Sequence, residues 1–332
     1  MLSKADTSIL VFILALKSLP GVGNKTIQKL FSEKKDLIEN APRFDFEFIK
    51  ALGIQKVNAA LETIEFDGWG RLKNEAANTL AVAESAGIKM LHPLMDDYPQ
   101  RLLKNKSFPP LLFYRGNSEA LNTEKAVAIV GTRNPTETGK RWARRLAGLL
   151  VEDDYVIISG LAIGSDTMGH EGALEAHGKT VAVLPLPLDM PVYPRNNREL
   201  AERILENDGA LVSEYPPGKK ISDRQLISNL VARDEWQPGL ADGIIAVETS
   251  QDGGTRHALK HAEKTNTPIA VFDYSFISDI DFTDSHFGGN VSYLQSEKAS
   301  GIHDTSSIEA FKDRMNTYRN SCNTEQAQLP LL

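Results

Sequence analysis

The stretch that decides the fold is Ala126-Val-Ala-Ile-Val-Gly-Thr-Arg-Asn134. Its opening apolar run is typical of a strand that is buried on both faces of a sheet. A helical pattern begins near Gly139, so Gly131-Thr132-Arg133 is predicted to connect this strand to a helix. Backbone N–H groups in such a turn point outward, and the helix dipole favours an anion beside them. We predict that the turn binds a phosphate, with Arg133 as a bidentate partner; a purely structural turn is the alternative.

Short β-branched runs alternate with amphipathic helical patterns from this stretch onward. Strands are expected at Ala126–Val130, Val156–Ser159, Thr180–Leu184, Ala210–Glu214, Gly243–Glu248 and Pro268–Phe272, and helices at Gly139–Leu150, Gly169–His177, Asn197–Glu206 and Thr255–Lys264. This alternation implies βαβ units and a parallel sheet covered on both faces. We therefore predict an α/β fold with an extended Rossmann-like sheet over residues 124–320. A peripheral strand and a closing helix are expected within 273–320, and a flexible tail over 321–332.

The preceding residues have a different pattern. Over residues 1–88, apolar residues recur at helical spacing in Ile9–Leu19, Thr26–Phe31, Phe46–Leu52 and Ala76–Ala86. The turn Leu19-Pro-Gly-Val-Gly-Asn-Lys25 is predicted to be the hairpin of a helix-hairpin-helix element in a helical, SAM-like domain. Such hairpins can present N–H groups to a nucleic-acid phosphate, but few basic residues flank this one, which favours a structural role. Residues 89–123, rich in proline and aromatic residues, are predicted to be a connector.

A second glycine-containing loop, Ser159-Gly-Leu-Ala-Ile-Gly-Ser-Asp166, follows the second predicted strand. Gly160 and Gly164 permit a close approach of the backbone to a ligand. The glycine spacing differs from the dinucleotide-binding fingerprint. Asp166 is predicted to cap the following helix, with a general base as the alternative. His170 is expected to lie at the surface or near a helix end.

Two further loops follow later strands of the predicted sheet. Tyr193-Pro-Arg-Asn-Asn-Arg198 brings two arginines to the strand ends, and Asp252-Gly-Gly-Thr-Arg-His257 forms an anion cradle that begins a helix. Loops at the carboxyl ends of parallel strands can converge on one crevice. The predicted contacts with nucleic-acid phosphates are Gly131, Thr132, Arg133, Lys140, Gly160, Ala162, Gly164, Ser165, Asp166, Arg195, Arg198, Arg233, Gly253, Gly254, Thr255 and Arg256.

The composition limits the function classes. The net charge of −7 argues against indiscriminate coating of nucleic acid, so phosphate contacts must come from a local basic patch. The single cysteine excludes a disulfide framework and a cysteine-based zinc site. The histidines show no metal-ligand spacing, and we expect no metal and no cofactor. The apolar run Ile9–Leu16 is too short to span a bilayer, and no signal peptide is recognised. We expect no membrane association and a cytoplasmic location.

The segment Gln328-Leu-Pro-Leu-Leu332 ends the sequence after a polar stretch. An apolar peptide on a flexible terminus suits docking into a groove of a partner. It resembles the short peptides that bind bacterial sliding clamps, with Leu332 in place of the usual phenylalanine. The predicted partner-binding residues are Gln328, Leu329, Leu331 and Leu332.

The motifs together resemble those of the DNA-processing protein A (DprA/Smf) family, in order and spacing, over about residues 8–300. The stretches that carry the resemblance are Leu19–Gly23, Tyr98-Pro99, Pro109-Pro-Leu-Leu-Phe-Tyr-Arg-Gly116, Val130-Gly-Thr-Arg133, Ser159–Asp166, Tyr193–Arg198, Ser213-Glu-Tyr-Pro-Pro-Gly218 and Gly239-Leu-Ala-Asp242. The resemblance implies an extended Rossmann-like domain that binds single-stranded DNA by its backbone, forms a homodimer and helps to load a RecA-type recombinase. It also implies that Arg133 and the glycines of the 160–164 loop line the strand, without established catalysis.

The chain departs from the family pattern in two places. Around Arg233 it reads Val231-Ala-Arg-Asp-Glu-Trp236 where most members have a Pro-x-Arg-Asn-Arg stretch. Asp234 and Glu235 weaken that part of a phosphate track and would instead suit a ribose or a base. No C-terminal winged helix is expected, so the chain resembles a divergent branch. Natural transformation, repair, plasmid biology and phage defence all remain open as pathways.

Three functions follow as hypotheses. The leading one is non-catalytic, sequence-independent binding of single-stranded DNA, with Tyr193 or Trp236 stacking on a base. The second is a nucleotide sensor or a phosphoribohydrolase-like enzyme. Gly253-Gly254-Thr255 lacks the glutamate that follows the related loop of such enzymes. Asp166, Glu248 and His257 would still form a hydrolytic set, and Asp234-Glu235 would replace the missing acid. The third is a role in protein binding alone, through the C-terminal segment.

Overall fold

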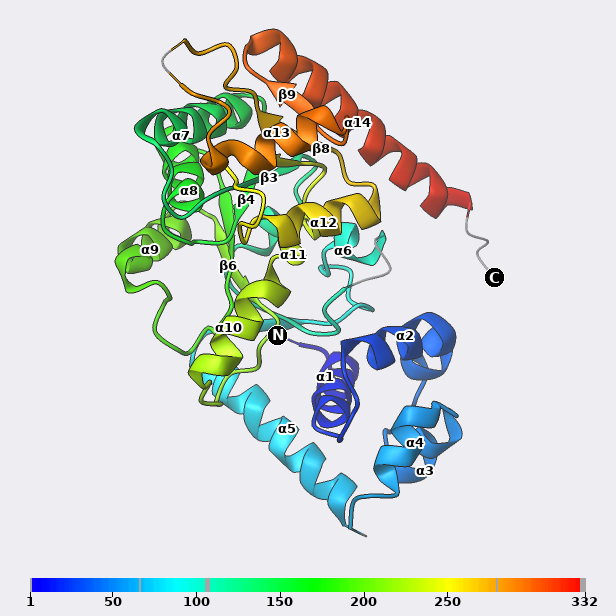
Figure 1. The fold of residues 1–332 in the computed structure, drawn as a ribbon. Helices are drawn as coiled ribbons and strands as arrows, with labels where there is room; N and C mark the ends of the chain where they lie inside the picture. Colours follow the sequence, from blue (N-terminus) through cyan, green and yellow to red (C-terminus); the bar gives the residue numbers. More distant parts are fainter. Residues whose placement is uncertain (1, 66, 105–107, 279, 329–332) are drawn as a thin grey trace. The chain divides into compact units, whose positions relative to one another are not determined.

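The computed structural model describes residues 2–65, 67–104, 108–278 and 280–328 (Figure 1). The chain forms two compact units. Unit 1 comprises residues 1–115, 187–190 and 213–220, and unit 2 comprises residues 116–186, 191–212 and 221–332.

The central feature of unit 2 is a parallel sheet in the order β6-β5-β4-β3-β7-β8-β9. Its strands are β3 Ala126–Val130, β4 Val156–Ser159, β5 Thr180–Val183, β6 Ala210–Ser213, β7 Ile244–Ala246, β8 Ile269–Phe272 and β9 Ser300–Ile302. The predicted strands are all present, each shortened by at most three residues, and β9 is the expected peripheral strand. The parallel α/β fold is therefore confirmed.

Helices connect these strands. They are α7 Glu137–Glu152, α8 Ser165–Glu175, α9 Arg198–Glu206, α10 Asp223–Arg233, α11 Trp236–Gly239, α12 Arg256–Thr265, α13 Gly288–Gln295 and α14 Thr305–Gln328, with 3₁₀ turns η1 Ser118–Leu121, η2 Arg195–Asn197 and η3 Ser285–Phe287. Ala143, Leu146, Ala147 and Leu150 form one apolar face of α7 at helical spacing. This face packs with α8, α14 and alternate residues of the sheet in a common core. α11 and α12 contact β3 and β8 respectively.

Helices α7 and α8 approach each other closely at a glycine. A Cβ atom added to Gly172 in α8 would overlap the carbonyl oxygen of Arg144 in α7. Because this neighbour is backbone, it can yield only if one helix shifts. We expect Gly172→Ala to lower the free energy of unfolding by about 1–3 kcal/mol, as overpacking does, measured by denaturant titration. Gly148→Ala in α7 is the control, since its added methyl group meets nothing closer than 3.8 Å. It should be neutral or stabilising; equal losses in both variants would contradict the explanation.

Unit 1 is mainly helical, as expected. Its elements are α1 Lys4–Lys17, α2 Asn24–Glu39, α3 Phe46–Ala51, α4 Gln55–Leu61, α5 Gly68–Ser85, β1 Lys89–Leu91, α6 Gln100–Lys104 and β2 Leu112–Gly116. Strands β1 and β2 pair in antiparallel orientation, so part of the segment that we predicted to be a connector forms regular secondary structure. The helix α4 was missed.

The predicted hairpin lies between α1 and α2. Gly21 has a φ of +73°, which glycine adopts without steric cost, while Leu19 and Val22 are buried. Asn24 accepts a hydrogen bond from Nζ of Lys17 at 3.0 Å and donates one to Glu214 at 2.6 Å. These contacts, all within unit 1, agree with the structural role favoured by the sequence.

The end of the chain differs from the expectation. Helix α14 continues to Gln328, so residues 321–328 are helical where a flexible tail was predicted. Of the predicted partner-binding residues, Leu329, Leu331 and Leu332 lie outside the described residues, and only the backbone of Gln328 is described. Within the described ranges, no helix combines the length and apolar character needed to cross a membrane.

Candidate functional site

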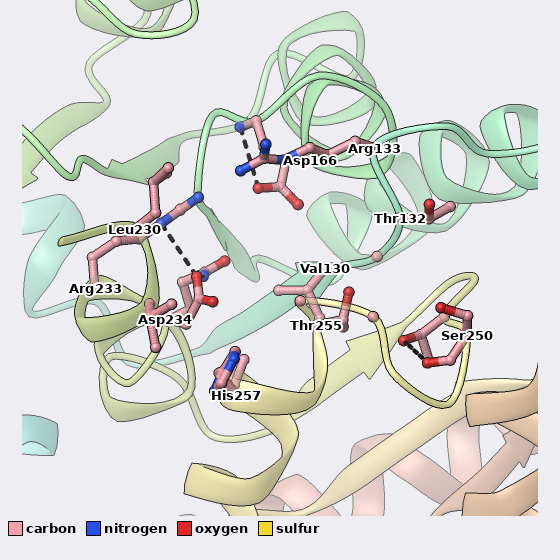
Figure 2. Close-up of a pocket in the computed structure, with 18 residues that line it drawn as sticks. Val130, Thr132, Arg133, Asp166, Leu230, Arg233, Asp234, Ser250, Thr255 and His257 are labelled. Carbon is pink, nitrogen blue, oxygen red and sulfur yellow. Dashed lines mark hydrogen bonds and ion pairs between the residues drawn. The ribbon is translucent and has the colours of Figure 1, made fainter. Parts of the chain in front are cut away.

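The candidate site lies where the order of the parallel strands reverses. The chain passes from β3 to β4 on one side, while β7 and β8 lie on the other side of β3. Connections on the two sides diverge at such a switch point and leave a crevice at the carboxyl ends of the strands. A cavity of about 450 Å³ lies in this crevice (Figure 2). It is lined by Val130, Gly131, Thr132, Arg133, Ala162, Asp166, Leu230, Val231, Arg233, Asp234, Gln237, Thr249, Ser250, Gly253, Gly254, Thr255, His257 and Ala258.

The turn after β3 is held by its neighbours. The N–H of Thr132 donates to the carbonyl of Glu248 at 2.7 Å, and the carbonyl of Thr132 accepts from the N–H and the hydroxyl of Ser165, each at 3.1 Å. A Cβ on Gly131 would overlap Ser165, so only glycine permits this approach. Ser165 thus fixes the turn and does not line the cavity. Arg133 is exposed, and it borders both this cavity and a smaller neighbouring one.

The loop after β4 folds around a carboxylate. Asp166 accepts hydrogen bonds from the N–H groups of Gly160 at 3.1 Å and Ala162 at 3.3 Å. The prediction that Asp166 caps its own helix is therefore wrong: it binds the preceding loop, and Gly164, with φ +88°, occupies the N-cap position. Burial raises the pKa of Asp166, while Arg233 and the two N–H groups oppose this rise.

Arg233 is a buried cation, only 4% exposed. It donates from Nη1 to the carbonyl of Val183 at 3.1 Å, and its Nε lies 3.2 Å from Oδ1 of Asp234. Its guanidinium also lies directly against the backbone of Gly160. Burial raises the pKa of Asp234 to about 6, with Arg233 opposing that rise and Asp166 adding to it. Arg233 lines the cavity as predicted, but its charge is already engaged by the two carboxylates.

The loop after β7 contains the residues that were predicted to form an anion cradle. Within this loop, Thr249 is held by Asn290, whose Oδ1 accepts from the N–H of Thr249 at 2.8 Å. The carbonyl of Gly253 accepts from the N–H of Arg256 at 3.2 Å as α12 begins. Among the described residues, we find no partner for the N–H groups of Gly254 and Thr255, which line the cavity. The space beside Gly254 is open, so an anion can approach the backbone there.

Several predicted contacts do not line this cavity. Lys140 pairs with Glu137 at 2.7 Å, and Arg256 pairs with Asp252 at 3.3 Å. The other predicted residues outside it are Gly160, Gly164, Ser165, Arg195 and Arg198. The predicted loops thus converge only in part, and the cavity has two acidic and two arginine side chains where a more basic groove was expected.

The loop after β5 contributes to a smaller cavity of about 60 Å³, which is adjacent because both share Arg133, Ala162, Leu230 and Arg233. Tyr193 and Ile163 line it and are 36% and 44% exposed, which leaves their apolar surfaces accessible. Trp236, in contrast, is only 4% exposed. The proposed stacking of Trp236 on a base is therefore wrong, whereas Tyr193 retains an accessible ring.

The predicted hydrolytic set is not assembled. Glu248 is fully buried, accepts from the N–H and hydroxyl of Thr136 at 2.8 and 2.6 Å, and contacts Nε2 of His286 at 2.8 Å. It lines no part of the cavity that holds Asp166 and His257. Its bonds join the loop after β7 to the start of α7, which is a structural role.

The histidines also differ from the expectation. His170 is fully buried with Nδ1 2.7 Å from the hydroxyl of Thr180, so the predicted surface position is wrong. Burial lowers the pKa of His170 to about 3, which keeps the ring neutral. His261 is likewise buried. Across the described part of the chain, no group of three His, Cys, Asp or Glu side chains is arranged to hold a metal ion.

Sequence reasoning missed several lining residues. Thr249 and Ser250 directly follow a predicted strand, and that position was a usable signal. Leu230, Val231 and Gln237 lie in α10 and α11, and no motif at the end of a strand indicates that they belong to the site. The sequence around them carries no signal of a ligand site, so only the fold brings them to the cavity.

These features define a Rossmann-like protein with a crevice at the switch point of a parallel sheet. The family model described as DNA recombination-mediator protein A matches residues 89–311, and the chain belongs to this family. The recognition made from the motifs is thereby confirmed.

Relatives agree with this assignment. The chain is 37% identical to Protein Smf of Synechocystis over 184 residues, which are 54% of this chain and 45% of that protein. It is 38% identical to DNA processing protein DprA of Streptococcus pneumoniae over 188 residues, 56% of this chain and 64% of that protein. The chain thus spans about half the length of the curated relatives it matches.

Solved structures are also similar. The structure of DprA from Streptococcus pneumoniae matches with a TM-score of 0.71 and 23% identity, covering 93% of this chain and 98% of that one, which supports the fold. DNA processing protein A from Helicobacter pylori matches with a TM-score of 0.56 and 26% identity, covering 70% and 96%. The latter structure is described as giving insight into a single-stranded DNA binding mode.

Proposed function

We propose that this chain is a non-catalytic protein of DNA processing or recombination that binds single-stranded DNA through its phosphates. The observation that carries the proposal is the convergence of the turns after β3, β4 and β7 on one crevice, with exposed Arg133 at its edge. The described binding of single-stranded DNA by the relative from Helicobacter pylori supports the same reading. Gly254 and Thr255 offer N–H groups to a phosphate, and Arg133 offers a bidentate cation.

The smaller cavity provides a place for a base. Tyr193 and Ile163 present apolar surface beside Arg133, so a base can stack there while a neighbouring phosphate pairs with the guanidinium. Stacking tolerates any base, because every base has a π-face. Binding is therefore proposed to be largely independent of sequence.

The wider roles rest on family membership alone. We propose homodimer formation, cooperation with a RecA-type recombinase and a cytoplasmic location on that ground. Sliding-clamp binding rests on the segment 328–332 and requires a pull-down with and without residues 326–332. Genetic experiments, and not the geometry of this site, test the pathway. The alternatives are natural transformation, repair and defence against phage and mobile elements.

The first test is a titration of a fluorescent oligo(dT) with wild-type protein and Arg133→Ala at several salt concentrations. We expect Arg133→Ala to weaken binding by about tenfold, since a hydrogen bond to a charged group contributes about 1.5–3 kcal/mol. The slope of log affinity against log salt should fall by about one contact.

The matched control for that titration is Arg224→Ala. Arg224 is exposed, lies at the start of α10 and does not line the cavity. This variant removes the same charge from the protein, so it should leave the affinity and the salt slope nearly unchanged. Equal losses in the two variants would show that net charge, and not this crevice, governs binding.

A further inference from the structure

Two carboxylates in a phosphate-binding crevice require an explanation. Asp166 and Asp234 both line the cavity, and Figure 2 shows their carboxylates pointing toward its middle. An ionised carboxylate only accepts hydrogen bonds, and it repels a phosphate. Arg233 offsets part of this charge, but it is buried and already bonded to Val183 and Asp234. The acidic side of the cavity therefore suits a ligand with hydrogen-bond donors.

A third acceptor lies beside these carboxylates. Gln237, 2% exposed, donates from its amide nitrogen to Oδ1 of Asp234 at 3.1 Å. Its Oε1 is buried and has no hydrogen-bond partner among the described residues. An orphaned buried acceptor is costly unless a ligand or water satisfies it. The contact with Asp234 also fixes the side chain of Gln237, so the acceptors of α10 and α11 are held in place.

The opposite side of the cavity is suited to an anion. It is formed by Gly253, Gly254 and Thr255 at the start of α12. Arg133 lies on the side of Asp166 (Figure 2) and lowers the pKa of Asp234, so its charge is close to both carboxylates. The cavity of about 450 Å³ is of the size that holds one small ligand. An anion on one side and donors on the other, within that volume, describe a single nucleotide unit.

The donors distinguish one kind of nucleotide from another. Within a DNA strand, both sugar oxygens that link the phosphates are esterified, and the 2′ position carries no hydroxyl. A ribose carries a 2′-hydroxyl, and a carboxylate near the phosphate-binding turn is the group that accepts from it in Rossmann-like sites. The sugar-phosphate backbone of DNA can therefore use Arg133 and the glycine turn, but it has no hydroxyl to donate to the acidic side, and the only donors that a DNA strand has are the N–H groups of its bases.

We propose that the cavity binds a ribonucleoside monophosphate unit, with its phosphate against Gly254, Thr255 and Arg133 and its ribose hydroxyls donating to Asp234 and Asp166. This goes beyond DNA binding, which uses only part of the same crevice. The unit can be a free ribonucleotide or one residue of an RNA strand. Since Arg133 serves both ligands, a bound ribonucleotide competes with DNA at the crevice edge.

The test uses the full chain and isothermal titration with the four ribonucleoside 5′-monophosphates and their 2′-deoxy counterparts. We expect at least one ribonucleotide to bind about tenfold or more tightly than its deoxy form, the effect of one hydrogen bond to a charged group. Asp234→Ala should reduce this ratio to near one, and Asp234→Asn, which keeps one acceptor, should give an intermediate ratio. The ratio is the readout because removing a negative charge strengthens the binding of both forms alike.

The control is Asp313→Asn in α14, since Asp313 is exposed and does not line the cavity; the ribo-to-deoxy affinity ratio of this variant should equal that of the wild type. The proposal is overturned if no ribonucleotide binds, if ribo and deoxy forms bind equally, or if the preference survives Asp234→Ala. Matched oligo(rA) and oligo(dA) separate the two sources: a preference for oligo(rA) identifies a strand residue, and its absence identifies the free nucleotide. Oligo(dT) titrated in parallel separates this proposal from DNA binding, because either can fail while the other holds.

Discussion

Replacing Arg233 with methionine is expected to destabilise unit 2 by about 3–5 kcal/mol at pH 8, the effect of breaking a buried ion pair. Methionine keeps most of the side-chain volume, so the change isolates the charge and its hydrogen bond to Val183. At pH 8 the variant would bury the carboxylates of Asp166 and Asp234 without their cation. Denaturant titration of the free energy of unfolding measures the loss.

The loss of stability in Arg233→Met should be smaller at acid pH, and the direction of this pH dependence follows from the two carboxyl groups. Burial raises the pKa of Asp166 and Asp234, and Arg233 opposes both rises. Without Arg233 both pKa values rise further above their unfolded values. A carboxyl group whose pKa is higher in the folded state than in the unfolded state contributes its full stability below the unfolded pKa. That contribution to the free energy of unfolding is lost as the pH rises through the folded pKa. The difference between variant and wild type should therefore grow from pH 4 to pH 8.

Arg133→Met is the control for this measurement. Arg133 is exposed, so its replacement should change the free energy of unfolding by only a few tenths of a kcal/mol at either pH. A loss in Arg233→Met that is the same at pH 4 and pH 8 would refute the role assigned to the carboxylates, because lost packing alone does not titrate.

Gly160→Ala is expected to have a comparable effect, although it removes no charge. The added Cβ would overlap the guanidinium of Arg233, which lies against the backbone of Gly160. Arg233 is buried and can yield only by leaving Val183 and Asp234. The substitution should thus break the buried ion pair by displacing Arg233, and the free energy of unfolding should fall by about 3 kcal/mol at pH 8.

A double-mutant cycle tests this explanation directly. If the clash with Arg233 is the cause, Gly160→Ala should cost much less when Arg233 is already alanine, and the two changes should be strongly non-additive. Gly254→Ala, in the larger cavity, is the control, because nothing lies within 4 Å of its added Cβ. Additive losses at residues 160 and 233 would place the strain of Gly160→Ala elsewhere.

The residues around Asp166 show where local reasoning reaches its limit. Asp166 follows a glycine loop and lies at the start of a helix, and this local pattern predicts a helix cap. In the structure its carboxylate turns back to the N–H groups of Gly160 and Ala162. The cation that makes this possible comes from α10, far along the chain. A local pattern cannot reveal that partner, because its position depends on how β4, β5 and α10 pack.

The sequence by itself determined the parallel sheet, the positions of its strands and the family, since buried strands and glycine turns are properties of short segments. It also determined that the turns after β3, β4 and β7 belong to one edge of the sheet, because parallel strands end on the same side. Only the tertiary structure decided which cations remain accessible. It exposed Arg133, buried Arg233 between two carboxylates, left Arg195 and Arg198 outside the cavity and brought Gln237 into it. The reason is that the burial and pairing of a charge depend on contacts between segments distant in the chain, and these contacts exist only once the sheet and its helices have packed.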